Sequence, residues 1–442
     1  MLRRQQLFPP VHSCARKGKI ILRKQSYIVA LFVFLFASAG SAQVQAVRDF
    51  DVYDSVGVNT HWTYGSPYQY LPQFTVLIGK MQKARIHHFR DGEWGNGLNT
   101  QPWVTSMYTQ LNQAGLKANL IVVGNNTSIT ATQLAADLKL YPGLESIEFP
   151  NEWDINGGAN WVNSAQVMLP QIWAAGNNLG VPVLGPSLTQ ASSFSKLGDV
   201  SRYMEYANVH DYQGNRNPET PGWGGGVDAQ GNGYGSILWN EDMAHEYAPG
   251  LPVISTETGF QTGTSGSTIP ETVEGTYAPR LYLARFKRGI RRTYMYELID
   301  SPNGWSSYGL LRYDLSPKPA YTAIQNLQEM LQDNDITFTP GKLAYTLSGN
   351  TSGVETLLMQ KSNGQYWLAV WLNGSIWDVN HGVATSLAPH QVTLTLKKGI
   401  TASHAAFFQS DGTVTKVSPG TSKYTFNASS CVTMIQIIRP GR

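Results

Sequence analysis

Two glutamates stand out in the sequence because each ends an apolar run and has polar neighbours. Glu152 closes "LESIEFPNE", directly after Asn151, and Glu257 lies in "LPVISTETGF". Where two such carboxyl groups converge, one can protonate a leaving oxygen while the other attacks or activates water, which is the minimum equipment for cleaving a glycosidic bond. A lone glutamate at a strand end is more often a surface or salt-bridged residue. The interpretation therefore depends on whether the fold brings the two together.

The elements that must position them are indicated by eight β-branched runs between residues 56 and 300. Helix-length amphipathic stretches such as "LPQFTVLIGKMQKA" and "AQVMLPQIWAAGNNLG" separate the runs. Strands that alternate with helices predict right-handed βαβ units and a parallel sheet, and eight units in about 250 residues match a (β/α)₈ barrel. The expected strands are 56–62, 85–91, 116–125, 144–152, 181–188, 206–214, 251–260 and 292–300.

Polar residues gather at the C-terminal ends of these strands, the face on which barrel loops build active sites. The fourth and seventh strands of a closed barrel of eight face one another across its mouth, so Glu152 and Glu257 can converge. A doubly wound open sheet usually carries a glycine-rich phosphate turn after its first strand, and "NTHWTYGSPY" is not one. The polar residues at the strand ends are Asn59, His61, Arg90, Asp91, Asn151, Glu152, His210, Tyr212, Glu257 and Glu297.

The two glutamate motifs resemble those of the clan A glycoside hydrolases, which are retaining enzymes built on (β/α)₈ barrels. "PNE", ending in Glu152, is similar to their acid/base motif, and "TETG", around Glu257, is similar to their nucleophile motif. "YELID…YGLLRYDLSPKPAY" (296–321) is similar to the eighth strand and final helix of family 39-like members, which also carry a C-terminal sandwich. The resemblance covers residues 56–330 and implies an acid/base role for Glu152 and a nucleophile role for Glu257.

The same resemblance implies roles for four supporting residues. Arg90 matches the arginine that keeps the nucleophile ionised, and His210 and Tyr212 match the pair that contacts the nucleophile and the sugar. Asn151 would donate a hydrogen bond to the 2-hydroxyl of the sugar, an interaction that strengthens in the transition state. Glu148 matches a recurring glutamate that points into the barrel.

The chain departs from the clan pattern in two places. Tyr296 and Glu297 stand where many members have a tryptophan, and Trp153 begins "WDING" after the Asn–Glu pair. Glu297 and His61 are each as consistent with a structural ion pair as with sugar binding, and loop tryptophans either pack loops onto the barrel or stack on sugars. The substrate-binding candidates are His61, Trp62, Trp94, Trp153, Tyr296, Glu297 and Trp305.

The implied reaction is a double displacement on a β-glycosidic bond of a polysaccharide or oligosaccharide. Glu257 attacks the anomeric carbon while Glu152 protonates the leaving oxygen, and the two carboxyl groups must lie about 5–5.5 Å apart. Aromatic residues spread over several loops favour endo action. A transglycosylase with the same residues and a non-catalytic carbohydrate-binding barrel stay open as alternatives. No metal or organic cofactor is required, and the sequence has no CxxC or HExxH motif.

The C-terminal part of the chain has a different texture. After the Pro-bounded helix "SPKPAYTAIQNLQEML", short alternating runs with frequent turn signals predict a β-sandwich over 333–442, following a barrel over 43–332. No linker separates the two, so we expect them to pack together, and the segment 43–55 could add a strand to the sandwich. Three sandwich tryptophans are open to either a packing or a carbohydrate-binding role: Trp367, Trp371 and Trp377.

The first 42 residues are typical of an export signal. A basic stretch, the apolar run "YIVALFVFLFASAG" and small residues before Ala42 predict a cleaved signal peptide and a secreted or periplasmic protein. An uncleaved anchor is the alternative, although about 13 apolar residues are too few for a comfortable span.

Charge and cysteine content change once this leader is removed. Seven of the 33 Lys and Arg lie in it, which leaves 26 basic residues against 30 acidic ones and no basic run for nucleic acid. Cys14 is lost with the leader, so Cys431 has no disulfide partner in the chain. The oligomeric state is left open.

Overall fold

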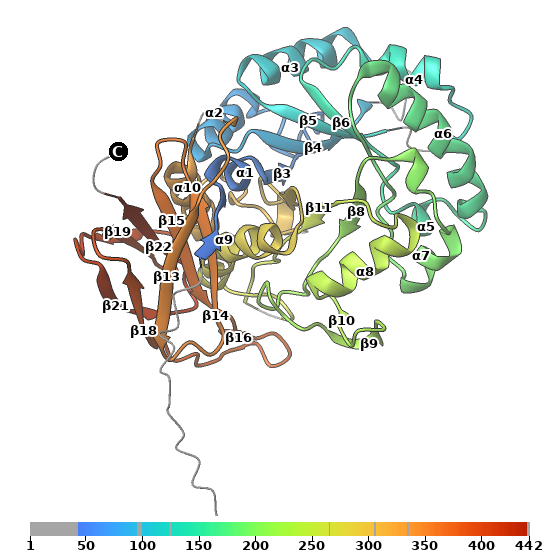
Figure 1. Cartoon of the computed structure of the whole chain (residues 1–442). Coiled ribbons are helices and arrows are strands. Elements are labelled where there is room, and N and C mark those ends of the chain that lie inside the picture. Colours follow the sequence, from blue (N-terminus) through green and yellow to red (C-terminus); the bar gives the residue numbers. More distant parts are fainter. Residues whose placement is uncertain are drawn as a thin grey trace, which may run out of the picture. The chain divides into compact units, whose positions relative to one another are not determined.

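The chain folds into a parallel β-barrel surrounded by helices and a C-terminal β-sandwich (Figure 1). The computed structural model describes residues 43–94, 100–122, 126–264, 266–304, 306–333 and 336–439. The (β/α)₈ barrel and the sandwich confirm the fold expected from the sequence. The predicted signal peptide, residues 1–42, lies outside the described residues. Within the described ranges, no helix has the length and apolar character needed to cross a membrane.

Every expected barrel strand is present, although most are shorter than the runs that predicted them. Neighbouring strands pair in parallel in the order β7-β6-β5-β4-β3-β12-β11-β8. A parallel bridge between Leu184 and Tyr206, with a 2.9 Å hydrogen bond from Gly185 N to Tyr206 O, joins the two ends of this order and closes the barrel. The strands are β3 (Val56–Asn59), β4 (His88–Gly92), β5 (Lys117–Ile121), β6 (Leu144–Glu148), β7 (Val183–Leu184), β8 (Ala207–His210), β11 (Val253–Thr258) and β12 (Thr293–Met295).

The helices that cover the barrel have well-defined ends. Pro102 and Pro319 open α3 and α10 at positions where the missing N–H has no partner to lose. Gly180 and Gly289 close α6 and α9 in the left-handed conformation that glycine adopts without strain. The helices are α1 (Asp49–Asp54), α2 (Phe74–Ala84), α3 (Pro102–Gln113), α4 (Ala131–Leu138), α6 (Trp161–Leu179), α7 (Ala191–Leu197), α8 (Ile237–Tyr247), α9 (Glu271–Arg288) and α10 (Pro319–Leu331).

The sandwich consists of a four-stranded sheet, β1-β13-β18-β21, and a six-stranded sheet, β2-β14-β15-β22-β19-β20. The segment that precedes the barrel takes part in both sheets, because β1 pairs with β13 and β2 pairs with β14. The strands are β1 (Gln43–Gln45), β2 (Val47–Arg48), β13 (Lys342–Gly349), β14 (Val354–Gln360), β15 (Tyr366–Leu372), β18 (His390–Leu396), β19 (Thr401–Phe408), β20 (Val414–Val417), β21 (Lys423–Ala428) and β22 (Thr433–Ile438).

Strand β15, "YWLAVWL", is buried on both faces. Its even-numbered residues, such as Leu368 and Val370, belong to the core between the two sheets. Its odd-numbered residues, such as Trp367, Ala369 and Trp371, belong to the core that continues into the barrel. The six-stranded sheet therefore packs between the other sheet and the barrel, and the expected close packing of the two parts is confirmed.

Two short hairpins leave these layers. The hairpin β9–β10 (Trp223–Val227 and Gly233–Tyr234) follows barrel strand β8, and the hairpin β16–β17 (Trp377–Asp378 and Val383–Ala384) follows sandwich strand β15. Both hairpins contribute to cavity walls described below.

Candidate active site

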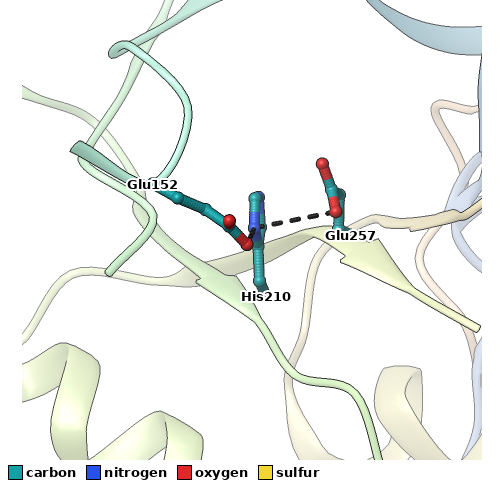
Figure 2. Close-up of side chains that lie close together, drawn as sticks. All are labelled: Glu152, His210 and Glu257. Atoms are coloured by element: carbon teal, nitrogen blue, oxygen red, sulfur yellow. Dashed lines mark hydrogen bonds and ion pairs between the residues drawn. The ribbon is translucent and has the colours of Figure 1, made fainter. Parts of the chain in front are cut away.

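The carboxyl ends of β6, β8 and β11 bring Glu152, His210 and Glu257 together, and Figure 2 shows the imidazole of His210 between the two carboxylates. Nδ1 of His210 lies 2.9 Å from Glu152 Oε1 and 3.8 Å from Glu257 Oε2. One polar atom from each of the three residues lies within 4.8 Å of the other two. This spacing is close to the separation of about 5–5.5 Å typical of retaining glycosidases and shorter than the about 6.5–9.5 Å typical of inverting ones.

A tight turn places Asn151 and Glu152 at the barrel mouth. Glu152 has a left-handed backbone (φ 44°, ψ 51°) and precedes the short helix α5 (Trp153–Asn156). Its N–H donates to Ser187 Oγ at 3.2 Å, and Asn156 Nδ2 donates to the carbonyl of Asn151 at 2.9 Å. A left-handed glutamate costs on the order of 1–2 kcal/mol, so these contacts stabilise a conformation that the chain alone disfavours.

Arg90, in the middle of β4, is hydrogen-bonded to residues at or near the ends of β3, β6 and β11. Its Nε and Nη2 donate to both oxygens of the buried Glu148 at 2.8 and 2.6 Å, and its Nη1 donates to Glu257 Oε1 at 2.6 Å. Nη1 also donates to Asn59 Oδ1 at 3.0 Å, and Nη2 to Asn151 Oδ1 at 2.7 Å. These contacts use all five guanidinium hydrogens, so Arg90 is fixed in place and contacts Glu148 and Glu257 at the same time.

Glu257 has the environment of an ionised carboxylate. Burial favours the protonated form, but the nearby charges of His210 and Arg90 and the hydrogen bonds from Arg90 and Tyr212 outweigh it and lower the pKa of Glu257 to about 2. Tyr212 Oη donates to Glu257 Oε2 at 3.0 Å. The side chain of Glu257 is 14% exposed, and that of Glu152 is 24% exposed.

The surroundings of His210 indicate which ring nitrogen carries the proton. Nε2 lies 3.4 Å from Arg90 Nη2 and 3.2 Å from Thr256 Oγ1. Nδ1 faces oxygens of both carboxylates, and an ionised carboxylate can only accept, so Nδ1 is assigned as an N–H. That N–H faces both carboxylates and donates to Glu152, the nearer of the two.

A cavity of about 800 Å³ lies over Glu257. Of the residues expected from the sequence, it is lined by His61, Arg90, Trp94, Asn151, Tyr212, Glu257 and Tyr296. Further lining residues were not expected: Tyr64, Asn215, Gln261 and Ser267 come from loops with no motif of their own, and Tyr308 had been matched only as part of a longer motif. Tyr308 lies within the "YGLLRYD" stretch, and its ring packs against Tyr212 and Tyr296 at 5.9 and 5.8 Å.

A second cavity, of about 110 Å³, lies on the other side of Glu152. Glu152, His210 and Tyr212 form its inner wall, and Tyr234 and Trp239 contribute aromatic rings. Tyr234 comes from the β9–β10 hairpin, which is rich in glycine and has no strand signal in the sequence. Tyr212 lines both cavities, whereas Glu257 lines only the large one and Glu152 only the small one.

Three of the predicted substrate-binding residues that the structure describes do not line these cavities. Trp62 is fully buried, with its ring packed edge-on against Phe74 and Phe89. Trp153 is 4% exposed, and Glu297 is buried at the end of the barrel, 3.4 Å from His61 and accepting from Ser306 at 2.9 Å. Trp305 lies outside the described residues.

The sequence and the fold were compared with those of known proteins. No family model matches the sequence, and no curated protein matches it. A solved structure of a family 39 glycoside hydrolase from the gut symbiont Bacteroides cellulosilyticus WH2 matches 89% of this chain and 82% of its own, with a TM-score of 0.56 and 16% identity. The fold is that of a family 39 glycoside hydrolase. This structural likeness agrees with the resemblance of "PNE" and "TETG" to clan A glycoside hydrolase motifs. At 16% identity it establishes the fold alone.

Two other solved structures match more distantly. A β-glucuronidase from an uncultured Clostridium sp. matches with a TM-score of 0.45 and 14% identity, over 62% of this chain and 50% of its own. A β-glucuronidase from Bifidobacterium dentium matches with a TM-score of 0.45 and 17% identity, over 62% of this chain and 46% of its own. The alignment spans about half the length of these two proteins.

Glu152, His210 and Glu257 are also close enough together to ligate a metal ion. The charge around them opposes that use. Glu257 already accepts hydrogen bonds from Arg90 and Tyr212, and the guanidinium is 2.6 Å from one of its oxygens. A divalent ion would have to bind beside this fixed positive charge, so the donor set is better suited to proton transfer and nucleophilic attack.

Proposed function

We propose that this protein is an exported, retaining glycoside hydrolase that cleaves β-glycosidic bonds in a polysaccharide or oligosaccharide by double displacement. The observation that carries the proposal is the spacing of Glu152 and Glu257: one carboxylate oxygen of each lies within 4.8 Å of the other and of a ring nitrogen of His210. The different surroundings of the two carboxyl groups support different roles. Arg90 contacts Glu257 directly, whereas Glu152 faces the N–H of His210.

In the first step, Glu257 attacks the anomeric carbon and Glu152 transfers its proton to the leaving oxygen. Glu257 enters as a carboxylate because Arg90 and Tyr212 stabilise its charge. The electron pair of the broken C–O bond stays with the leaving oxygen, and the product is an ester between the sugar and Glu257. Asn151 accepts from Arg90 through Oδ1, which leaves Nδ2 to donate to the 2-hydroxyl of the sugar.

In the second step, Glu152 accepts a proton from water and the water oxygen attacks the anomeric carbon, releasing Glu257 as a carboxylate. Formation of the ester has removed the negative charge of Glu257, which makes the ionised form of Glu152 less costly. The Nδ1–H of His210 donates to Glu152 at 2.9 Å and is aimed at the carboxylate that this step uses as a base.

The two cavities give the bound sugar chain a direction. Glu257 and Asn151, which act on the sugar that is transferred, line the large cavity. Glu152, which protonates the leaving oxygen, lines the small one. The transferred part of the substrate therefore occupies the large cavity and the leaving group the small one. At about 800 Å³ the large cavity lies in the upper part of the about 300–1,000 Å³ range of sites for drug-sized molecules, which favours more than one sugar unit.

The experiment that tests the proposal is proton NMR of the first product anomer, after a panel of β-linked polysaccharides and aryl β-glycosides has identified a substrate. Retention is expected, and inversion would exclude double displacement.

A second measurement isolates the nucleophile. Glu257→Ala is expected to lower kcat by about 10⁴-fold or more, with partial recovery in azide as the anion replaces the carboxylate. Glu329→Ala, an exposed glutamate on α10, is the matched control and should keep full activity. Full activity of Glu257→Ala would remove it as the nucleophile.

A further inference from the structure

A third cavity, of about 590 Å³, lies where the sandwich meets the barrel mouth. One wall is the β16–β17 hairpin with its turn, which supplies Trp377, Asn380 and His381. The other wall is the barrel loop after β11, which supplies Ser267 and Thr268. Ser267 also lines the large cavity over Glu257, so the two cavities adjoin at this residue.

We propose that this third cavity is a distal subsite that binds an uncharged sugar unit of the same substrate chain, on the transferred side of the bond that is cleaved. The inference rests on the proposed glycosidase function and deepens it. It assigns substrate binding to the sandwich, so that the sandwich supports more than the packing of the barrel.

The position of the cavity determines which part of the chain enters it. It adjoins the large compartment, which contains Glu257 and Asn151, and shares no lining residue with the small compartment beside Glu152. A sugar chain that extends away from the cleaved bond through the large compartment passes Ser267 and meets the hairpin. A single sugar bound at Glu257 occupies the space before Ser267.

The hairpin is held firmly enough to act as a binding wall. Trp377 Nε1 donates to the carbonyl of Thr268 at 3.2 Å, and Ile376 N donates to the hydroxyl of Tyr277 on α9 at 2.9 Å. Across the cavity, Asn215 Nδ2 donates to the carbonyl of Ser267 at 2.7 Å. Both walls are thus hydrogen-bonded to residues of the barrel, and a ligand would not need to order them.

The chemistry of the walls suits a neutral sugar. Trp377 is partly exposed, unlike the buried Trp367 and Trp371, and an indole face packs well on a sugar ring. Asn380 is exposed at the hairpin turn; its Oδ1 accepts from Arg216 at 3.3 Å, and its Nδ2 makes no hydrogen bond within the described part of the chain.

Two charged groups near the hairpin, Asp378 and Arg216, do not line the cavity. Asp378 accepts from His381 Nδ1 at 2.6 Å and from the backbone N–H of Asn380 at 2.9 Å. The guanidinium of Arg216 lies over the ring of Trp223, 4.4 Å from its centroid. His381 is the one titratable residue among those that line the cavity, and its Nδ1 is bonded to Asp378, so the subsite favours an uncharged unit.

The test compares short and long substrates. Trp377→Ala and Asn380→Ala are assayed on 4-nitrophenyl β-glycosides and on the β-linked oligosaccharides of the same sugar, from the disaccharide to the hexasaccharide. On the longer oligosaccharides kcat/KM is expected to fall about five- to tenfold for Trp377→Ala, and by a smaller factor for Asn380→Ala. On the aryl glycosides both variants should match the wild type. Asn427→Ala, an exposed asparagine on β21, is the control for a surface change in the sandwich.

An equal loss on short and long substrates would mean that the hairpin only supports the fold and would overturn the subsite. Unchanged kinetics of both variants on every oligosaccharide would overturn it as well.

A binding measurement separates the subsite from the catalytic proposal. Affinity gels containing the same polysaccharide should retard Glu257→Gln, and the added Trp377→Ala change should reduce that retardation. A wild type without activity, combined with retardation that depends on Trp377, would contradict the proposed hydrolysis and leave the subsite standing. Retardation unaffected by Trp377 would contradict the subsite.

Discussion

Glu152 and Glu257 have the same side chain, and the difference between them lies in their neighbours. Glu257 accepts from Arg90 at 2.6 Å and from Tyr212 at 3.0 Å, so its ionised form is stabilised. Glu152 lies on a left-handed turn outside the strand and accepts from His210. Glu257 thus lies within a barrel strand, and Glu152 lies on a loop at the mouth of the barrel. This division matches the separate tasks of nucleophile and proton carrier.

Replacing Tyr212 by Phe should separate these effects at the residue scale. The change removes one hydrogen bond to Glu257, so the pKa of Glu257 should rise from about 2 toward its ordinary 4.5. Glu257 must be ionised to attack, and the acidic limb of the kcat/KM profile should therefore move to higher pH in the variant. At neutral pH we expect a loss of about tenfold, the value of a hydrogen bond to a charged group. A pH profile of kcat/KM checks both.

Tyr108→Phe is the matched control, because the buried hydroxyl of Tyr108 on α3 has no hydrogen-bond partner in the described part of the chain. It should leave the profile unchanged. The stability effect has the same sign as the kinetic one. A lowered carboxyl pKa stabilises the fold above the unfolded value and loses that contribution as pH falls through about 2. Tyr212→Phe should start to lose it at a higher pH, and an identical acidic limb in both variants would contradict the assignment.

Motifs predicted well which residues the barrel brings together, and residue type predicted the lining of the cavity poorly. Asn151 and Glu152 follow β6 and Glu257 lies near the end of β11, at positions that a closed barrel forces together. Trp62 and Trp94 looked equivalent in the sequence, since each follows a strand. Trp62 is fully buried whereas Trp94 lines the cavity. The difference depends on how each loop packs after it leaves the strand, which local sequence does not encode.

At the scale of the element, strand β3 depends on a glycine that the pattern of β-branched residues does not explain. A Cβ on Gly57 would lie 2.5 and 2.8 Å from ring atoms of Tyr294 on β12, the strand with which β3 pairs. The ring of Tyr294 is 1% exposed and has no space to withdraw. Gly57 thus allows a large side chain from the last barrel strand to pack against the first.

Gly57→Ala should therefore lower the free energy of unfolding by about 1–3 kcal/mol, as overpacking does in other cores. Gly79→Ala provides a matched control inside helix α2, because a Cβ there meets no atom within 4 Å. That change should stabilise the protein by about 0.5–1 kcal/mol, since alanine loses less backbone entropy than glycine in a helix. Urea denaturation of both variants measures the change in the free energy of unfolding, which should be negative for Gly57→Ala and positive for Gly79→Ala. Shifts in the same direction would contradict the close packing of Gly57 on Tyr294.

The sequence predicted the elements that have a clear hydrophobic pattern. It did not predict the two hairpins, one of which is rich in glycine and the other very short. All eight barrel strands coincide with β-branched runs. The β9–β10 hairpin contains "WGGGV" and the β16–β17 hairpin has strands of two residues, too short for an alternating pattern. Both form because loops of the barrel and sandwich pack around them. The walls of the small cavity and of the distal subsite are for that reason the parts of the site that sequence alone did not supply.

At the scale of the molecule, the barrel and sandwich share one core, and the sequence carried a sign of it. The run "YWLAVWL" of β15 has no polar residue, which is typical of a strand buried on both faces. Polar contacts accompany this packing. Arg280 on α9 pairs with Glu219 and donates to the carbonyl of Ser430 at 3.3 Å, and Trp371 Nε1 donates to Glu219 Oε1 at 2.7 Å. Carboxylate, guanidinium and indole thus link the two parts through a fully buried arginine and a partly buried glutamate.

Trp371→Phe should therefore destabilise the whole described fold rather than the sandwich alone. It removes a hydrogen bond from the partly buried Glu219, and we expect a loss of about 1.5–3 kcal/mol beyond the effect of the smaller ring. Trp367→Phe controls for ring size, because its buried indole nitrogen has no hydrogen-bond partner in the described residues. Thermal unfolding followed by calorimetry should show one transition in the wild type, shifted further by Trp371→Phe than by Trp367→Phe. Two separate transitions, with only one moved by Trp371→Phe, would mean that barrel and sandwich unfold independently despite their shared core.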